Sequence, residues 1–336
     1  MSPESSFSIA LLGLGRAGQF HLQSIRAIPG AILRHAVDLD EDRANRVAAE
    51  FRCSASQTPD DALADPEVDA VIVATPTQEH VGPIRAALEA GKAVFTEKPL
   101  GSRLEEIDAC FALARARELP LMVGFNRRFD PSFSRLARGV HQGSVGELHH
   151  LRVTSRDSPL PSMEYIKTSG GIFHDCIVHD LDMIRFIARQ DPVEVYAVGS
   201  SFIPEIQALD DWDSVLVSLK FAGGLIASID VDRFAAYGYD QRIEAFGDKG
   251  MLQAENRSPV STVLATAEGI LRPPIEFSFP TRYRDAYRIE LERFRDCVLH
   301  RAPLPITPED VRMNFILADL AEGSCRTGRP TAAVCR

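Results

Sequence analysis

The chain has 336 residues, of which 45% are hydrophobic and 25% are charged, as expected of a globular protein with one large or two smaller domains. Its 37 Lys and Arg residues face 47 Asp and Glu residues, and the net charge of −10 argues against nonspecific nucleic-acid binding. No apolar run is long enough to span a membrane, and the first run lacks the basic start of a signal peptide. We therefore expect a cytoplasmic protein without a membrane partner.

The first third of the chain alternates strand-like and helix-like segments. Short apolar runs predict strands at 7–12, 31–37, 68–74, 93–96 and 121–124. Helical spacing predicts helices at 16–28, 41–51, 78–90 and 104–118. This alternation with short connections is typical of a parallel sheet, so residues 1–124 are predicted to form a Rossmann domain.

After residue 124 the pattern changes to strands joined by short turns, which favours antiparallel pairing. Strands are predicted at 148–156, 193–201, 214–221, 225–233 and 242–246, and helices after Gly171, at 285–300 and at 308–322. We therefore predict an α/β protein in which residues 125–336 form an α+β domain with a large, mostly antiparallel open sheet. The six cysteines include no CxxC pair, which favours reduced thiols over a disulfide frame or a zinc site.

A glycine motif follows the first predicted strand. Gly13, Gly15 and Gly18 have GxGxxG spacing and open the first predicted helix, where free N–H groups can bind a pyrophosphate. Asp38 ends the second predicted strand, where a carboxylate can accept hydrogen bonds from ribose hydroxyls and repel a 2′-phosphate. Because Leu39 rather than an arginine comes next, NAD is favoured over NADP.

Two further predicted strands end in polar residues. Thr75 and Pro76 follow one strand, and Glu97 and Lys98 follow the next. Ligands in such sheets bind at the carboxyl ends of the strands, so both loops are expected to line the cofactor crevice. Pro99 restricts Lys98 to an extended backbone. Taken alone, the local sequence favours a surface lysine before a turn.

The stretch from 170 to 186 carries Asp175, His179 and Asp182 on one face of a predicted helix, at i, i+4 and i+7. A metal site is one alternative, with His174 as a further ligand type. The two histidines are five residues apart, however, and not the four that stack ligands in HExxH, so no metal is expected.

Taken together, these motifs resemble those of the Gfo/Idh/MocA oxidoreductases, and among them the inositol 2-dehydrogenases. The matching segments are Gly13-x-Gly15-Arg16-x-Gly18, Glu97-Lys98-Pro99, the GFNRRFD motif at 124–130, SRD at 155–157, and Gly170-Gly171 followed by Asp175, His179 and Asp180. The resemblance runs from about residue 7 to about 325. It implies a Rossmann domain and a second domain with an open sheet, through which members assemble as dimers or tetramers.

The resemblance also implies site residues. Lys98, Asp175 and His179 would be catalytic. Substrate contacts would add Asn126, Arg127, Asp157 and Tyr287. Cofactor binding would involve Gly13, Gly15, Arg16, Gly18, Asp38, Thr75, Pro76, Glu97 and Lys98.

The hypothesis is an NAD-dependent dehydrogenase that oxidises a secondary hydroxyl of a cyclic polyol, with myo-inositol the first choice and 2-keto-myo-inositol the product. His179 would be the general base, Lys98 would stabilise negative charge on the oxygen, and Asp175 would hold substrate or lysine. Other inositol isomers, an aldose sugar, or a non-catalytic NAD-bound sugar sensor are the alternatives.

Overall fold

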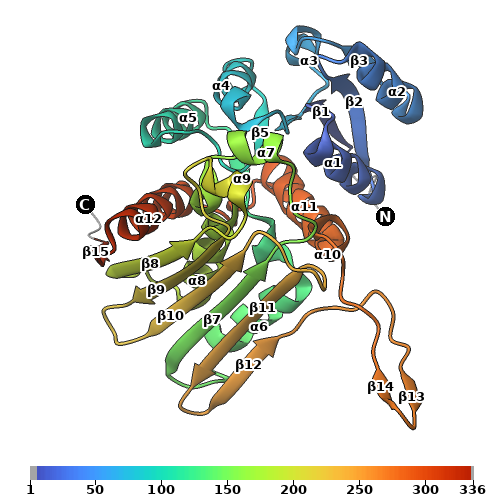
Figure 1. Cartoon of the computed structure of the whole chain (residues 1–336). Helices are drawn as coiled ribbons and strands as arrows, with labels where there is room; N and C mark the ends of the chain where they lie inside the picture. Colours follow the sequence, from blue (N-terminus) through green and yellow to red (C-terminus); the bar gives the residue numbers. More distant parts are fainter. Residues whose placement is uncertain (1–5, 334–336) are drawn as a thin grey trace. The chain divides into compact units, whose positions relative to one another are not determined.

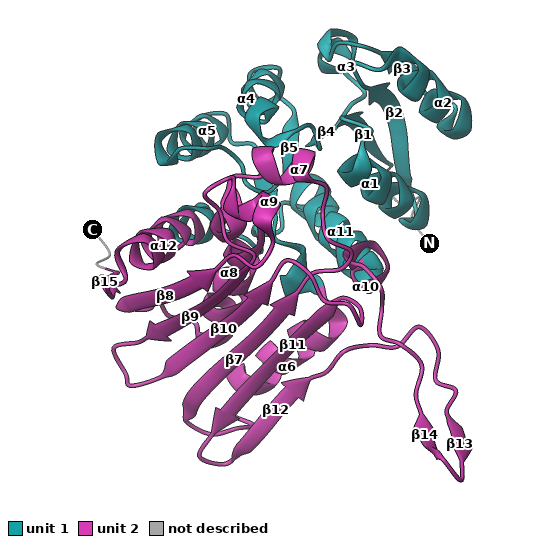
Figure 2. Ribbon diagram, in the orientation of Figure 1, with its two compact units in different colours: residues 1–129, 284–313 teal, residues 130–283, 314–336 magenta. Residues whose placement is uncertain are grey.

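The computed structural model describes residues 6–333 and divides into two compact units (Figure 2). Unit 1 comprises the residues up to 129 together with 284–313, and unit 2 comprises 130–283 together with the residues from 314 onward. The predicted functional division, with NAD binding in 1–124 and substrate binding in 125–336, stays a prediction.

Unit 1 is built on a six-stranded sheet in the order β3-β2-β1-β4-β5-β6. Every neighbouring pair in it is parallel. The strands are β1 (Phe7–Leu12), β2 (Ala31–Val37), β3 (Ser54–Ser56), β4 (Ala70–Val73), β5 (Ala93–Glu97) and β6 (Leu121–Gly124). All residues of β1 and β4 are buried, as expected of strands covered on both faces. The predicted Rossmann fold is confirmed.

The helices of unit 1 come from both ends of its sequence. They are α1 (Arg16–Ala27), α2 (Glu41–Phe51), α3 (Asp60–Ala64), η1 (Thr77–Glu79), α4 (Val81–Glu89), α5 (Leu104–Ala116), η2 (Asn126–Phe129) and α11 (Arg284–His300). The long helix α12 (Pro308–Thr327) begins here and continues into unit 2. In α11, Phe294 packs edge-on against Phe7 of β1 and Phe95 of β5, at centroid distances of 6.1 and 5.7 Å. A late helix therefore completes the core of the first domain.

Unit 2 contains a seven-stranded sheet in the order β12-β11-β7-β10-β9-β8-β15. The strands are β7 (Leu148–Arg156), β8 (Glu194–Ser200), β9 (Ser214–Lys220), β10 (Ile226–Asp232), β11 (Asp240–Gly247), β12 (Gly250–Ala254) and β15 (Thr331–Ala332). β7 pairs in parallel with β10, and the other neighbours are antiparallel. The predicted mostly antiparallel open sheet is confirmed, with one parallel pair that the short turns did not reveal.

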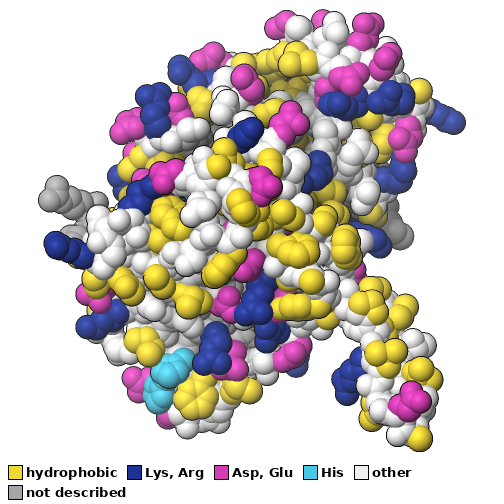
Figure 3. Space-filling view, in the orientation of Figure 1, with side chains coloured by type: hydrophobic (Ala, Val, Ile, Leu, Met, Phe, Trp, Pro, Cys, Tyr) yellow, Lys and Arg dark blue, Asp and Glu magenta, His cyan; other side chains and the backbone are white. Residues whose placement is uncertain are grey.

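The unit 2 sheet has one covered face. Helix α6 (Pro131–His141) packs against β11 and β12, and α8 (Val178–Ala188) packs against β7 (Figure 1). The opposite face carries exposed apolar side chains that project from its strands, namely Tyr196, Val198, Leu216, Ile226 and Phe246. A separate hairpin of β13 (Leu264–Thr266) and β14 (Gly269–Leu271) extends away from this sheet (Figure 1). Figure 3 shows hydrophobic side chains over both regions.

Shorter helices connect the strands of unit 2: α7 (Met163–Thr168), α9 (Pro204–Gln207) and α10 (Phe279–Arg282). The prediction of one regular helix after Gly171 is only partly correct, because the segment is not α-helical throughout. A π-helical turn, η3 (Phe173–Ile177), precedes α8. Because a π-helical turn takes in more residues than an α-helical turn, it changes which side chains share a face.

No helix in residues 6–333 is long and apolar enough to cross a membrane. The cysteines in the described part of the chain are free, namely Cys53, Cys110, Cys176, Cys297 and Cys325. Cys335 lies outside the described residues.

Candidate active site

The glycine turn of unit 1 links β1 to α1. Gly13 has φ +89°, and a Cβ there would lie 2.6 Å from the carbonyl oxygen of Ala74. A Cβ on Gly18 would lie 2.2 Å from the carbonyl oxygen of Gly13. Only glycine fits at either position, because the turn, the end of β4 and the first turn of α1 are in close contact. Gly13 therefore permits the tight turn, and Gly18 permits the close approach of α1 to that turn.

Gly15 differs from these two glycines. A Cβ at Gly15 would meet no atom within 4 Å, so the space beside it is open. Gly15 is the N-cap residue of α1, with no side-chain cap and no acidic residue in the first turn. A helix start of this kind leaves N–H groups for an anion. The turn therefore fits the pyrophosphate of a dinucleotide. Arg16 follows as the first residue of α1.

Asp38 follows β2 and is held beside the glycine turn. Its carboxylate accepts hydrogen bonds from the backbone N–H groups of Leu14 at 2.8 Å and Asp40 at 2.9 Å. Arg43 in the first turn of α2 also donates to it, at 3.1 Å. Partial burial raises the pKa of Asp38, but these hydrogen bonds outweigh it and lower the pKa below its ordinary value. Asp38 is therefore a fixed carboxylate, and Arg43 is the nearby arginine that the immediate sequence did not reveal.

The loops after β4 and β5 carry the other predicted cofactor residues. A Cβ on Gly13 would lie 2.7 Å from the backbone nitrogen of Thr75, so this loop contacts the glycine turn. Pro76 follows as the N-cap residue of η1. Lys98 directly follows β5, which is the neighbour of β4 in the sheet, and is half-buried. Both loops therefore lie at the carboxyl edge of the unit 1 sheet, and their predicted role in lining a cofactor crevice stays a prediction.

Glu97, the last residue of β5, has a partner that the sequence did not predict. Its Oε1 lies 2.8 Å from Nε2 of His21 in α1, and the His21 ring is fully buried. Tyr287 of α11 packs on the same part of α1, with its ring 5.4 Å from that of Phe20. The Tyr287 ring also forms a T-shaped contact with the His21 ring, at a centroid distance of 6.2 Å. Asn126 and Arg127 are buried in η2, which follows β6. Their predicted ligand contacts stay predictions.

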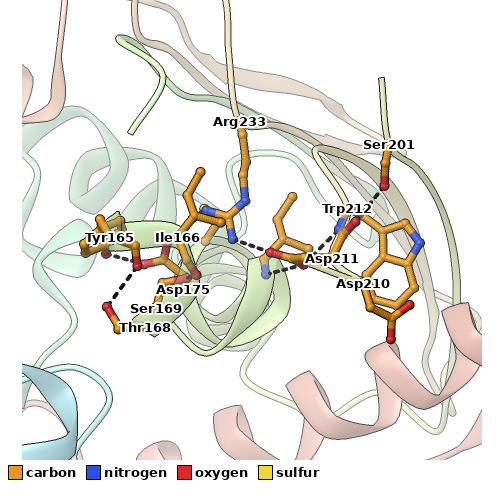
Figure 4. A network of polar contacts seen from close by, with 12 residues as sticks. Tyr165, Ile166, Thr168, Ser169, Asp175, Ser201, Asp210, Asp211, Trp212 and Arg233 are labelled. Carbon is orange, nitrogen blue, oxygen red and sulfur yellow. Dashed lines mark hydrogen bonds and ion pairs between the residues drawn. The ribbon is translucent and has the colours of Figure 1, made fainter. Parts of the chain in front are cut away.

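In unit 2, Asp175 belongs to a network of polar contacts (Figure 4). The Tyr165 hydroxyl donates to Oδ1 of Asp175 at 2.7 Å, and Nη1 of Arg233 donates to Oδ2 at 3.1 Å. Nη2 of Arg233 donates to Asp211 at 3.1 Å. Asp211 in turn accepts from the backbone N–H groups of Ile172 and Trp212. A buried arginine thus ties the π-helical turn to the loop that precedes β9.

Arg233 is the central cation of this network, and the sequence analysis did not single it out. It directly follows β10 and has no exposed surface. Burial lowers the pKa of its guanidinium, but the neighbouring Cys176, Asp175 and Asp211 groups raise it above the ordinary value. Arg233 is therefore a permanent cation that favours the carboxylate form of Asp175. Arg233 comes just after a strand whose residues alternate between buried apolar and polar ones, so the local sequence does not distinguish it from the other polar residues there.

The prediction that Asp175 and Asp182 share one face of a helix is wrong. Asp182 accepts a hydrogen bond from Asn314 of α12 at 2.7 Å, whereas Asp175 contacts Tyr165 and Arg233. His174 contacts α12 as well, with Nε2 2.9 Å from Asp319. The π-helical turn separates these directions.

His179 lies in the first turn of α8 and is half-buried. Asp157 follows β7, where its carboxylate accepts from the N–H of Ser158 at 2.8 Å. Among residues 6–333, no group of three His, Cys, Asp or Glu side chains is arranged to hold a metal ion. Lys98 belongs to unit 1 and Asp175 and His179 belong to unit 2, so the catalytic set stays a prediction that draws on both units.

Comparisons with known families match both units. A model described as an oxidoreductase family with an NAD-binding Rossmann fold matches residues 7–125, and the GFO/IDH/MocA C-terminal domain matches residues 133–253. The chain belongs to the Gfo/Idh/MocA oxidoreductase family. The resemblance inferred from the motifs is thus confirmed, and so is NAD as the cofactor.

Several relatives in this family match nearly the whole chain. The inositol 2-dehydrogenase of Rhizobium meliloti is 40% identical over 312 residues, 93% of this chain and 94% of that protein. A crystal structure of a myo-inositol dehydrogenase from Corynebacterium glutamicum matches with a TM-score of 0.93 at 36% identity, covering 98% of this chain and 100% of that one. A scyllo-inositol dehydrogenase from Lactobacillus casei, solved with NAD(H) and scyllo-inositol, matches with a TM-score of 0.90 at 28% identity over 98% and 99% of the two chains. This Gfo/Idh/MocA member is an NAD-dependent dehydrogenase that acts on CH–OH donors.

Proposed function

We propose that this protein oxidises the C2 hydroxyl of myo-inositol to give 2-keto-myo-inositol, with transfer of hydride to NAD. The observation that carries the proposal is the fixed carboxylate of Asp175, one turn before His179 in a chain whose relatives include inositol dehydrogenases. Bound NAD would accept the hydride at C4 of its nicotinamide ring. The protein has to bind and orient the polyol, take up the hydroxyl proton and stabilise charge on the oxygen.

Unit 1 supports this chemistry at the carboxyl edge of its sheet. Lys98 supplies a cation on a loop next to the loop that carries Thr75, and Thr75 lies beside the glycine turn. In the proposed mechanism the ammonium group donates to the substrate oxygen as negative charge develops there. Asn126, Arg127 and Tyr287 would bind the remaining hydroxyls of the ring.

Unit 2 supports the proton transfer. His179 would be the general base, because an unperturbed imidazole has a pKa of about 6.5 and suits proton uptake near neutral pH. Arg233 and Tyr165 fix the carboxylate of Asp175, which would then orient the substrate through one of its oxygens. Asp157 would add a further acceptor for a polyol hydroxyl.

The second candidate substrate is scyllo-inositol. A matching relative was solved with scyllo-inositol bound. The two isomers differ only at the reacting carbon, so a site that reads the other hydroxyls would accept the ring of either. Aldose sugars and a non-catalytic sensing role are the more distant alternatives.

A substrate panel tests the proposal. NADH formation is measured with myo-, scyllo- and chiro-inositol, glucose and xylose at saturating NAD, for the wild type, His179→Ala and the control His149→Ala. His149 is exposed on β7 of the same unit. We expect kcat/KM to be highest for myo-inositol and kcat to fall about 10²- to 10⁴-fold in His179→Ala alone. A higher kcat/KM for another compound would contradict myo-inositol as the substrate. An unchanged kcat in His179→Ala would contradict His179 as the general base.

We also propose that the protein is a homo-oligomer, a dimer or a tetramer, formed through the uncovered face of the unit 2 sheet. Val198 and Leu216 are paired across β8 and β9 and are 51% and 56% exposed. Contiguous apolar surface of this kind marks an interface. Leu216→Asp should lower the mass seen in sedimentation, whereas the control Leu39→Asp in unit 1 should not.

A further inference from the structure

His80 has an unusual pair of hydrogen-bond partners. It is the N-cap residue of α4, and only 1% of its surface is exposed. Its Nδ1 lies 2.8 Å from the carbonyl oxygen of Pro99, and its Nε2 lies 2.8 Å from the carbonyl oxygen of Thr75. Both partners can only accept. A neutral imidazole can donate to one of them, and only an imidazolium can donate to both.

The two carbonyl groups belong to the two loops of the cofactor crevice. Thr75 follows β4 and contacts the glycine turn, as described above. Pro99 follows Lys98 at the end of the neighbouring strand β5. The imidazole therefore spans the gap between the loop beside the cofactor turn and the backbone segment that carries Lys98.

We propose that His80 is a positioning residue, which fixes the backbone after Lys98 against the Thr75 loop and so sets the place of the Lys98 ammonium group. The proposal rests on the proposed role of Lys98. His80 touches neither reacting atom nor substrate in this account, and it acts through the two carbonyl groups that it holds.

The charges around His80 decide how strongly each loop is held. Burial lowers the pKa of the imidazole, the two carbonyl groups and Glu97 raise it, and Lys98 lowers it, with a net shift below the ordinary value. Each nitrogen of the ring faces one of the two carbonyl groups at 2.8 Å, so each loop is contacted by a different ring nitrogen. Replacing the ring by a side chain that keeps only one donor separates the two contacts.

Two substitutions make this separation. The amide of His80→Asn can occupy the place of Nδ1 and keep the contact with Pro99, while the longer amide of His80→Gln can occupy the place of Nε2 and keep the contact with Thr75. His35→Gln is the control, because His35 is a buried histidine of the same unit whose Nε2 lies 2.9 Å from Asp65, a residue of neither loop. Lys98→Ala is measured alongside.

The readouts are kcat and KM for NAD on the best substrate of the panel, the Kd for NADH without substrate, and the melting temperature. We expect kcat in His80→Gln to fall at least about tenfold, since small misplacement of a catalytic group costs up to about 100-fold, with little change in the Kd for NADH. In His80→Asn we expect a higher Kd for NADH and a smaller fall in kcat than in His80→Gln. His35→Gln should lower only the melting temperature.

The outcomes separate this proposal from the proposed function. Equal changes of kcat in the two His80 variants, or changes that follow the melting temperature as in His35→Gln, would overturn the positioning role alone, provided that Lys98→Ala lowers kcat. If Lys98→Ala leaves kcat unchanged, the role of Lys98 fails, and the role of His80 fails with it.

Discussion

Arg233 and Asp175 form a buried ion pair, with 3.1 Å between Nη1 and Oδ2, although 58 residues separate them in the chain. The pair joins the π-helical turn to the end of β10 and shares its cation with Asp211. Asp175 is thus a structural residue of unit 2 as well as a proposed catalytic one. Its substitution should affect stability and activity together.

Replacing Arg233 should destabilise the protein strongly. Arg233→Gln leaves the Asp175 and Asp211 carboxylates without their buried cation, and breaking such a pair costs about 3–5 kcal/mol of unfolding free energy. The control is Arg326→Gln, because the Arg326 side chain is 44% exposed where it pairs with Asp210 and should cost at most about 1 kcal/mol. Urea unfolding measures both. Similar losses of unfolding free energy in the two variants would contradict the claim that burial makes the Arg233 ion pair more important for stability than the exposed one.

The glycines of the turn should respond differently to alanine. Gly18→Ala places a Cβ 2.2 Å from the Gly13 carbonyl oxygen and should lower both the melting temperature and NAD affinity. Gly15→Ala meets no protein atom within 4 Å, so the melting temperature should stay near that of the wild type while the Kd for NADH rises. Calorimetric melting and NADH titration test this. Unchanged NADH binding in Gly15→Ala would place the pyrophosphate elsewhere.

Asp38 should control the choice between NAD and NADP. Asp38→Ser removes the fixed carboxylate and releases Nη1 of Arg43, which donates to it at 3.1 Å, for a 2′-phosphate, while Nη2 keeps its pairing with Asp40. We expect the KM for NAD to rise at least about tenfold, since a hydrogen bond to a charged group contributes about 1.5–3 kcal/mol, and NADP use to increase. Asp42→Ser, also in the first turn of α2, is the control. A wild type that already prefers NADP would refute this role of Asp38.

Two thiols should react slowly in the native protein. Burial raises the pKa of Cys53 and of Cys110 to about 11. Because the thiolate is the reactive form, its fraction at about pH 8 should be roughly two orders of magnitude below that of a free cysteine with a pKa of about 8.5. Alkylation followed by peptide mass spectrometry should show rates that rise about tenfold per pH unit up to about pH 11. Rates already at a plateau by about pH 9 would contradict these raised pKa values.

Local sequence patterns predicted five of the six strands of unit 1, because these strands are short and mostly apolar and buried. They missed β3 (Ser54–Ser56), whose residues are small or polar and are not buried. The same patterns missed α6, although Asp130 caps its first turn by accepting from the N–H groups of Ser132 and Phe133, and Pro131 begins it. An aspartate followed by a proline is a helix start signal that the sequence offered. No local signal indicated that α11, which follows most of unit 2 in the chain, would pack in unit 1. Its position depends on contacts between residues far apart in the sequence.

The site was predictable where one turn or one strand end creates it. Gly13, Gly15, Gly18 and Asp38 are close in sequence, and their geometry follows from one βαβ unit. Hydrogen-bond partners from distant segments could not be predicted. Arg233, which donates to Asp175, is an example. Arg43 was missed for a different reason, since the first turn of α2 brings it back to Asp38 from five residues further along the chain.

Isotope transfer tests the central claim most directly. The enzyme is incubated with NAD and myo-inositol that carries deuterium on C2, and the NADH is analysed by mass spectrometry. Oxidation of the C2 hydroxyl breaks the C2–H bond and passes that hydrogen to the cofactor as hydride, so the account predicts one deuterium in each NADH formed. NADH without deuterium, or no NADH from myo-inositol at all, would contradict it.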